Sequence, residues 1–233
     1  MLNNIPAIFS LGDTAAIIDL GNRMDHALNQ KVFAMQQWLQ AHPFPGITDL
    51  IPAYCSLTVL YDPVLVRKQV HPATTVFEWV RVKLQEAWEQ SGESPAGEAV
   101  LHRIPVCYEP PYGMDLAALA TEKQLSVPAI IDLHTARRYR VYMIGFLPGF
   151  AYLGPVDEQL ITPRKPQPVT VPAGSVGIAG AQTGIYPLSS PGGWTIIGRT
   201  PLKLFDPHAE TPVPLKAGDE VQFFAVGKEE IDL

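Results

Sequence analysis

The chain has 233 residues, 47% of them hydrophobic, and its 17 basic and 23 acidic residues give a net charge of −6. This length and composition predict a globular protein of one large or two ordinary domains, each with a hydrophobic core. Basic residues cluster no more densely than Arg137-Arg138 and Arg164-Lys165, which excludes the footprint of a nucleic-acid duplex and gives no support for anionic membrane as a partner. Residues 1–21 lack the basic start of a signal peptide, so the cytoplasm is the expected location.

The first hundred residues alternate between strand and helix patterns. Residues 15–20 predict a strand, the stripe from Leu28 to Leu39 predicts an amphipathic helix, and residues 46–51 and 56–61 predict two more strands. Thr75 and Glu78 have the spacing of a capping box that opens a second helix, which ends near Gly92. A polar linker and a strand at 99–107 follow. The order β-α-β-β-α-β predicts a ferredoxin-like domain over residues 1–108.

Two short helices are expected next, at 115–124 and at 126–135, where Ser126 can act as an N-cap. We expect residues 109–136 to connect the first domain to a second. From residue 137 to residue 233 the helical period disappears, and residues 145–207 are rich in Pro and Gly. Short runs typical of strands lie between these breakers, which predicts a compact β-sandwich or barrel: VTV, SVGIAG, WTIIG, LKLF and EVQFFAV.

Residues 166–198 contain no Asp, Glu, Lys, Arg or His. Pro and Gly interrupt this stretch too often for a membrane-spanning helix, and it carries too many apolar side chains for a disordered linker. We therefore expect it to form strands and shaped loops of the second domain. An uncharged lining of this kind can recognise a small polar ligand without burying an unpaired ion.

Common catalytic and metal signatures are missing from the sequence. It contains no phosphate-loop motif, the glycines of GSVGIAG lack dinucleotide spacing, and Ser175 is not in a nucleophile elbow. The six histidines stand far apart, so no metal site is predicted, and His134 is expected to be a packed or capping residue. Cys55 and Cys107 form no C-x-x-C pair and are expected to be small buried apolar groups. No catalytic residue is assigned.

Four loops in the second domain have the composition of a small-molecule anion site, because glycines expose backbone amides and the neighbouring side chains are neutral donors or cations. They read GFLPGFAYLG, TPRKP, AQTGIYP and SSPGGW. The alternative, that the Gly-Pro loops close a barrel and the rings pack in a core, stays open. The candidate substrate-binding residues are Phe146, Pro148, Gly149, Phe150, Tyr152, Arg164, Gln182, Thr183, Tyr186, Ser190, Gly192, Gly193, Trp194 and Arg199.

Long ordered motifs carry a family resemblance over nearly the whole chain. They include LGDTAAII, IPAYCSLTVLYDP, LHTARRYRVYMIGF, GFLPGFAYLG, TPRK, VPAGSVGIAGAQTGIYPLSSPGGW and IGRTPLKLFD. The chain resembles the family of the 5-oxoprolinase B subunit, which includes the kinase inhibitor KipI and allophanate hydrolase subunit 1, the carboxyltransferase C/D domain. The resemblance implies a ferredoxin-like domain followed by a cyclophilin-like barrel.

The same resemblance implies an activity and partners. Family members act with the A and C subunits of the enzyme, the latter similar to KipA and allophanate hydrolase subunit 2, to open 5-oxoproline to L-glutamate with ATP hydrolysis. This implies ATP, with Mg²⁺, bound together with one of these partners. Arg164 or Arg199 would meet a carboxylate or phosphate, and Gln182, Thr183 and Tyr186 would bind polar edges. Two alternatives remain: an inhibitor that binds a sensor histidine kinase, and a carboxyltransferase half of a biotin-dependent enzyme acting on urea or a relative.

Overall fold

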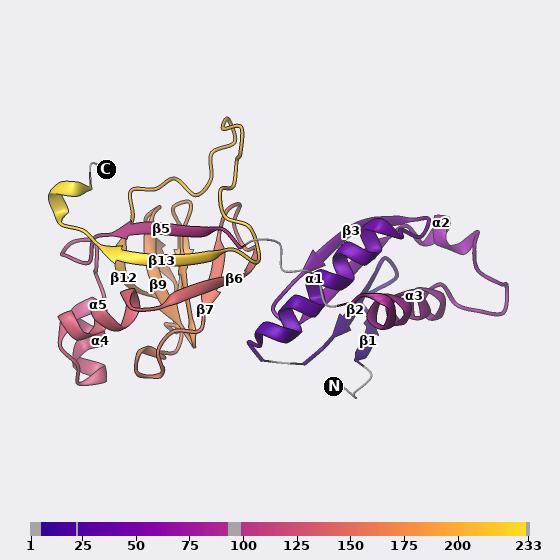
Figure 1. The fold of residues 1–233 in the computed structure, drawn as a ribbon, viewed down its shortest axis with the longest axis horizontal. Helices are drawn as coiled ribbons and strands as arrows, with labels where there is room; N and C mark the ends of the chain where they lie inside the picture. The colour runs from indigo at the N-terminus through magenta and orange to yellow at the C-terminus, as the bar shows by residue number, and fades with distance from the viewer. Residues whose placement is uncertain (1–5, 22, 93–98, 232–233) are drawn as a thin grey trace. The chain divides into compact units, whose positions relative to one another are not determined.

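The computed structural model describes residues 6–21, 23–92 and 99–231, and the chain forms two compact units, residues 1–97 and 98–233 (Figure 1). Each unit has its own sheet and its own hydrophobic core. Within these residues, no helix has the length and apolar character needed to cross a membrane.

The first unit is an antiparallel sheet packed against two long helices. The sheet order is β1-β2-β4-β3. Residues of α1 and α3 pack on one face of the sheet around Ile18, Leu57 and Val59. The elements are β1 (Ala7–Ser10), β2 (Ala15–Asp19), α1 (His26–Ala41), β3 (Ile47–Pro52), β4 (Ser56–Tyr61), α2 (Pro63–Arg67) and α3 (Val76–Gln90).

Both predicted helices form for the predicted reasons. Leu28, Val32, Met35 and Leu39 are all buried along α1. At the start of α3, the Glu78 backbone N–H donates to Thr75 Oγ1 at 3.1 Å, and Glu78 Oε2 accepts from the Thr75 backbone N–H at 2.9 Å. The capping box is thus confirmed.

The predicted β-α-β-β-α-β domain is not confirmed, because its last strand belongs elsewhere. Strand β1 was not predicted from the sequence. It forms an antiparallel hairpin with β2, in which Ala7 pairs with Asp19 and Ser10 pairs with Ala16, and it covers the outer edge of β2. Pairing β2 with β1 closes a much shorter loop than pairing β2 with residues 99–107 would. Because β1 already occupies this edge of β2, residues 99–107 cannot pair there. Residues 101–106 form β5, which pairs in parallel with β13 in the second unit. Most of the polar linker predicted between the second helix and the strand at 99–107 lies outside the described residues.

The second unit is a barrel of seven strands in the order β12-β9-β10-β7-β6-β13-β5, with a two-stranded ribbon of β8 and β11. Its strands are β5 (Leu101–Val106), β6 (Arg138–Ile144), β7 (Ala151–Gly154), β8 (Val169–Val171), β9 (Ser175–Ala179), β10 (Gln182–Ile185), β11 (Ser190–Gly192), β12 (Thr195–Arg199) and β13 (Glu220–Ala225). Its helices are α4 (Leu116–Lys123), α5 (Val127–Thr135), η1 (Glu158–Leu160) and η2 (Lys228–Glu230).

The two ends of the strand order meet, so the barrel is nearly closed. Cys107, just after β5, and Arg199, the last residue of β12, form an antiparallel bridge. A predicted strand at LKLF, residues 202–205, does not form. The expectation of a barrel is confirmed, whereas that particular strand prediction is wrong.

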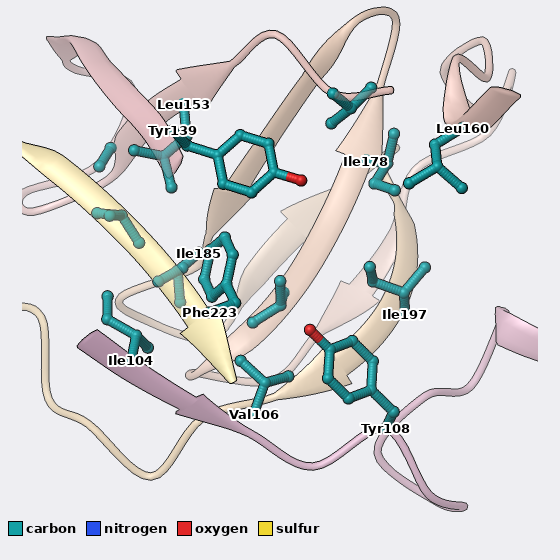
Figure 2. Close-up of a cluster of buried hydrophobic side chains, with 14 of the residues drawn as sticks. Ile104, Val106, Tyr108, Tyr139, Leu153, Leu160, Ile178, Ile185, Ile197 and Phe223 are labelled. Carbon is teal, nitrogen blue, oxygen red and sulfur yellow. The ribbon is translucent and has the colours of Figure 1, made fainter. Parts of the chain in front are cut away.

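Helices α4 and α5 belong to the barrel unit, rather than forming a connection between two domains. Leu116, Leu119 and Ile130 from these helices join the barrel core. Ser126 caps α5, since its Oγ accepts from Ala129 N–H at 3.2 Å, as predicted. Figure 2 shows the core that they join, with Tyr108 and Tyr139 turned into the barrel among Ile178, Ile197 and Phe223.

Candidate functional site

Four of the predicted aromatic residues gather in one layer on the outer face of the barrel wall. Phe150 lies 4.7 Å from Tyr152, 5.2 Å from Tyr186 and 5.3 Å from Trp194, measured between ring centroids. Val171, Ala179 and Ile196 complete this cluster, which is separate from the barrel core. We call it the outer aromatic layer. Its rings are packed against one another, which favours the packing alternative for these residues.

Glycines on two neighbouring strands make room for this layer. A Cβ on Gly184 of β10 would lie 3.0 Å from the Trp194 ring and 3.2 Å from the Phe150 ring. A Cβ on Gly177 of β9 would lie 3.1 Å from Trp194 and from Ile196. Gly192 is placed against the Tyr186 ring in the same way. Close packing therefore accounts for the glycine at each of these positions.

The turn before β7 holds three further predicted residues. Phe146 has a φ of +70° and is 63% exposed, and its ring meets Phe150 edge-on at 5.6 Å. Pro148 is exposed, whereas Gly149 is buried with a φ of +83°, a value that favours glycine. Gly149 also lies against the carbonyl of Leu204, where a side chain has no room. Of these three predicted residues, Phe146 and Pro148 are accessible.

Thr183 lies inside the barrel, on the face of β10 opposite to the outer aromatic layer. It is fully buried, and its Oγ1 donates to the Gly177 carbonyl at 3.0 Å. The same Oγ1 lies 2.9 Å from His134 Nε2, so His134 must donate from Nε2. Nδ1 then accepts from the Tyr108 hydroxyl at 2.8 Å. Thr183 is thus committed to a buried network, and Gln182, its half-buried neighbour, lies at the start of the strand.

His134 is neutral in this network. Complete burial lowers the pKa of its imidazole from 6.5 to about 3, because the interior disfavours the charged form. The Tyr139 hydroxyl donates to the His134 backbone carbonyl at 2.8 Å, and the Phe223 ring stacks on the imidazole at 4.6 Å. His134 is therefore a packed residue, as expected from the sequence.

The three predicted cations have different neighbours. Lys165 Nζ pairs with Asp115 Oδ2 at 2.6 Å, and this carboxylate also accepts from Ile196 N–H at 2.7 Å. Arg199 Nε donates to the Ala173 carbonyl at 2.8 Å. Arg164 is exposed and has no ion pair within the described ranges. Of the three guanidinium and ammonium groups, it is the one most available to a ligand.

Arg164 also lies near the edge of the outer aromatic layer. Burial raises the pKa of the Tyr152 and Tyr186 hydroxyls, and the positive charge of Arg164 opposes that rise at both. The Tyr186 hydroxyl is also hydrogen-bonded to the backbone of Trp194. An exposed guanidinium beside the half-buried Tyr152 phenol is suited to a carboxylate with an attached apolar ring. Arg164 and Tyr152 are therefore our candidate binding site, whereas Tyr186 is only 1% exposed and has no surface for a ligand.

The remaining predicted residues lie in the ribbon that covers the layer. Ser190 of β11 faces Val171 of β8, and its buried Oγ has no hydrogen-bond partner in the described part of the chain. The Gly193 carbonyl accepts from Lys165 N–H at 2.7 Å, which places the TPRK segment beside the end of the ribbon. The structure therefore brings segments 162–165, 182–186 and 190–194 together, as the loop pattern suggested.

Two cavities lie away from this set, and the sequence indicated neither. One, of about 310 Å³ in the first unit, is lined by Trp38, Leu39, His42, Pro43, Phe44, Pro45, Trp79, Lys83 and Glu86. The other, of about 430 Å³ in the barrel unit, is lined by Leu101, His102, Arg103, Ile104, Leu202, Lys203, Leu204, Pro214 and Leu215. The lining of the second cavity runs from Leu101 to Leu215, so no local motif could have revealed it.

Cys107 is buried, Cys55 is half-buried, and both are free thiols. Among the residues that the structure describes, no three His, Cys, Asp or Glu side chains are grouped so that they could hold a metal ion.

Comparisons with known proteins identify relatives that match this chain over nearly its full length. A protein from Bacillus subtilis, named as the B subunit of 5-oxoprolinase, is 42% identical over 225 residues, which is 96% of this chain and 94% of that protein. Its namesake from Escherichia coli O157:H7 is 38% identical, over 92% of this chain and 94% of that protein. Three sequence relatives carry this name.

Solved structures share the fold over nearly the full chain. The crystal structure of TTHA0988 has a TM-score of 0.76 and 34% identity, and it matches 94% of this chain and 40% of its own. The K. lactis urea amidolyase has a TM-score of 0.80 at 16% identity, matching 100% of this chain and 15% of its own, which shows a common fold alone. The sequence signature described as "Carboxyltransferase domain, subdomain C and D" matches residues 6–215. This chain therefore belongs to the family of carboxyltransferase domain, subdomain C and D, proteins.

Proposed function

We propose that this chain is the B subunit of an ATP-dependent 5-oxoprolinase, which opens 5-oxoproline to L-glutamate together with its A and C subunits. The observation that carries the proposal is the 42% identity with the B. subtilis protein of that name over nearly the full length of both chains. The fold adds support, because this seven-stranded barrel presents ordered loops next to an exposed cation.

The substrate has two features that the candidate site can recognise. 5-Oxoproline carries a carboxylate on a small lactam ring. The Arg164 guanidinium suits the carboxylate, and the half-buried Tyr152 ring offers an apolar surface with a hydroxyl group. We propose that Arg164 binds the carboxylate.

ATP has a poorer fit to this chain taken by itself. The glycine-rich run GSVGIAG forms β9 and pairs with β10 and β12 on its two sides, so its amides are used in the sheet instead of forming a phosphate nest. Lys165 and Arg199 are committed to Asp115 and the Ala173 carbonyl. These residues do not fit a phosphate group, and we place ATP binding on another subunit of the enzyme or at a junction with one.

A reconstitution experiment tests the proposal. The chain is purified with the products of its genomic neighbours, and glutamate formed from 5-oxoproline is measured with and without ATP. We expect ATP-dependent glutamate formation from the full set and none from this chain alone. No glutamate from the full set would contradict the proposal. Inhibition of kinase autophosphorylation by the chain alone, or biotin-dependent carboxylation of urea by the set, would then support the respective alternative.

Variants of Arg164 test the binding role within the active complex. Arg164→Ala is expected to raise the KM for 5-oxoproline at least tenfold, since it removes a charge-assisted hydrogen bond. Arg164→Lys is expected to recover part of that loss. The control is Arg23→Ala, an exposed arginine of the first unit, which should leave KM unchanged. An unchanged KM in Arg164→Ala would show that this cation serves another purpose.

A further inference from the structure

The barrel has an open seam between β5 and the segment that follows β12. The seam is closed at one point, where Cys107 N–H donates to the Arg199 carbonyl and Arg199 N–H donates to the Cys107 carbonyl, both at 2.9 Å. Beyond this pair the described chain shows no backbone hydrogen bond between residues 101–106 and residues 200–204. The strand order therefore ends at β5 on one side and at β12 on the other.

The sequence explains why the seam opens where it does. Continuing the antiparallel register from Cys107–Arg199 places Pro105 opposite Pro201, two residues further along each strand. Neither proline has an N–H, so this pair can exchange no backbone hydrogen bond. The next pair in the same register is Arg103 with Lys203, and like charges directly opposite each other destabilise a sheet. Two successive pairs thus prevent closure.

The backbone of β5 is left with an unpaired edge. Glu220 N–H donates to the Val100 carbonyl and Val226 N–H donates to the Val106 carbonyl, both at 3.0 Å. Even-numbered residues of β5 therefore direct their backbone groups toward β13 in the parallel ladder. Odd-numbered residues face the other way, as the bonds of Cys107 to Arg199 show. The N–H and C=O groups of Leu101 and Arg103 consequently face the seam.

The wall of the seam combines cations with apolar surface. The cavity there has a volume of about 430 Å³, and its lining contains Arg103 and Lys203 but no Asp or Glu. His102 Nε2 is paired with Asp219 Oδ2 at 2.9 Å, and that carboxylate also accepts from Lys216 N–H. Leu101 and Leu202 are 37% and 42% exposed at the two sides. In a chain of net charge −6, this is a locally cationic groove.

We propose that the seam binds an extended, acidic segment of a partner polypeptide as an additional strand. An unpaired strand edge binds extended peptides through main-chain hydrogen bonds, and side-chain pockets supply the specificity. Arg103 and Lys203 select Asp or Glu side chains, and Leu101 and Leu202 contact the alternate apolar ones. The inference rests on the proposed function in one respect: the other subunits of that enzyme are the partners used as probes.

Amide hydrogen exchange tests the strand directly. We expect the Leu101 and Arg103 amides to exchange fast in the chain alone, and to slow at least tenfold when the purified C or A subunit of the enzyme is added. The amides of His102 and Ile104 already face β13, so they serve as internal controls whose exchange should change much less.

Variants separate the backbone and charge contributions. Arg103→Pro removes an N–H that faces the seam together with the charge of Arg103, so Arg103→Ala, which removes the charge alone, is measured beside it. The double variant Arg103→Glu with Lys203→Glu reverses the charge of the wall. The proline variant and the double variant are each expected to weaken binding of the partner at least tenfold, measured by calorimetry, and the proline variant is expected to bind more weakly than Arg103→Ala. The variant Lys68→Glu with Arg81→Glu changes the net charge equally in the first unit and should bind normally. Because Arg103→Pro could misfold, its unfolding curve is compared with that of the parent, and the charge reversal provides the second test.

Three results would overturn the inference. Unchanged exchange and affinity in a complex that still makes glutamate would reject the seam as a docking site while leaving the proposed function intact. Failure of both partners to bind would reject it as well. Protection of the Leu101 and Arg103 amides by 5-oxoproline alone would show that the seam is a small-molecule pocket. Absence of glutamate formation despite tight, seam-dependent binding would reject the proposed function alone.

Discussion

Thr183 illustrates how burial changes the role of a polar side chain. From its place in the uncharged stretch, the Thr183 hydroxyl is predicted to bind a polar edge of a ligand. In the structure its hydroxyl links the Gly177 carbonyl to His134 inside the barrel, and no part of it is exposed. A buried donor that loses its acceptor costs its full desolvation penalty. The network therefore stabilises the fold.

Thr183→Val should lower the free energy of unfolding by about 1–3 kcal/mol, because it leaves the His134 Nε2–H without an acceptor. Urea denaturation followed by fluorescence measures this change. Thr195→Val is the matched control, since Thr195 is also buried in the barrel wall but has no side-chain hydrogen bond in the structure described. Equal effects of the two substitutions would show that the network contributes nothing.

Stability should also depend on pH through His134. The folded imidazole has a pKa of about 3 and the unfolded one a pKa near 6.5, so below pH 6.5 the unfolded state binds a proton that the folded state does not. The contribution of His134 to stability is fully present above pH 6.5. It is lost progressively as the pH falls toward 3, by up to about 1.4 kcal/mol per pH unit.

His134→Gln should be less stable at pH 7 yet lose stability less steeply between pH 6 and pH 4, because glutamine does not titrate there. The measurement is the urea midpoint of parent and variant at half-unit pH steps. Parallel pH curves for the two proteins would contradict the assignment of this slope to His134.

At the scale of elements, strands β9 and β10 carry a packed layer on each face. Their inward residues Val176, Ile178 and Ile185 join the barrel core, and their outward positions Gly177 and Gly184 accept the rings of the outer aromatic layer. Alternation of side chains across a strand makes this arrangement possible. The uncharged stretch is therefore a wall between two apolar layers, which explains its lack of charge.

Gly184→Ala should destabilise the barrel by about 1–3 kcal/mol, since the new methyl group would lie 2.9 Å from the Ala151 carbonyl oxygen and 3.0 Å from Trp194. Thermal unfolding of the purified chain measures the loss. Gly92→Ala is the control, because a Cβ there would meet no atom within 4 Å. A Gly184→Ala chain as stable as its parent would mean that the layer can move outward freely.

At the scale of the whole molecule, two units with separate cores imply two cooperative folding units. Residues such as Met35 and Leu84 belong to the core of the first, and Ile104 and Phe223 to that of the second. Strand β5 belongs to the second, where it pairs with β13 along its full length. The division therefore precedes β5 instead of following it.

Fragments of the chain test where the division lies. A fragment of residues 99–233 should fold and unfold cooperatively, whereas residues 109–233 should not, because the latter lacks β5 and leaves β13 unpaired on one side. Circular dichroism and urea titration of the two fragments make the comparison. Cooperative folding of 109–233 would instead favour the boundary predicted from the sequence.

Much of the fold followed from local patterns. The stripe of α1, the capping box of α3, the Ser126 cap and the breaks around the short strands each depend on residues close in sequence. Local patterns could not predict which strands pair with each other. The sequence indicated a strand at 99–107, but this strand could have joined an edge of the sheet in either unit. The early hairpin of β1 and β2 decided between them.

Some features of the candidate site also followed from the sequence, and others depended on the tertiary structure. By itself the sequence determined that residues 166–198 form an uncharged stretch of strands and shaped loops, that Arg164, Lys165 and Arg199 flank it, and which family the motifs resemble. Only the tertiary structure decided that Thr183 faces the barrel interior, that Lys165 is neutralised by Asp115, and that Arg164 is left exposed. The physical reason is that burial and charge pairing depend on residues far apart in the chain, such as His134 with Thr183 and Asp115 with Lys165.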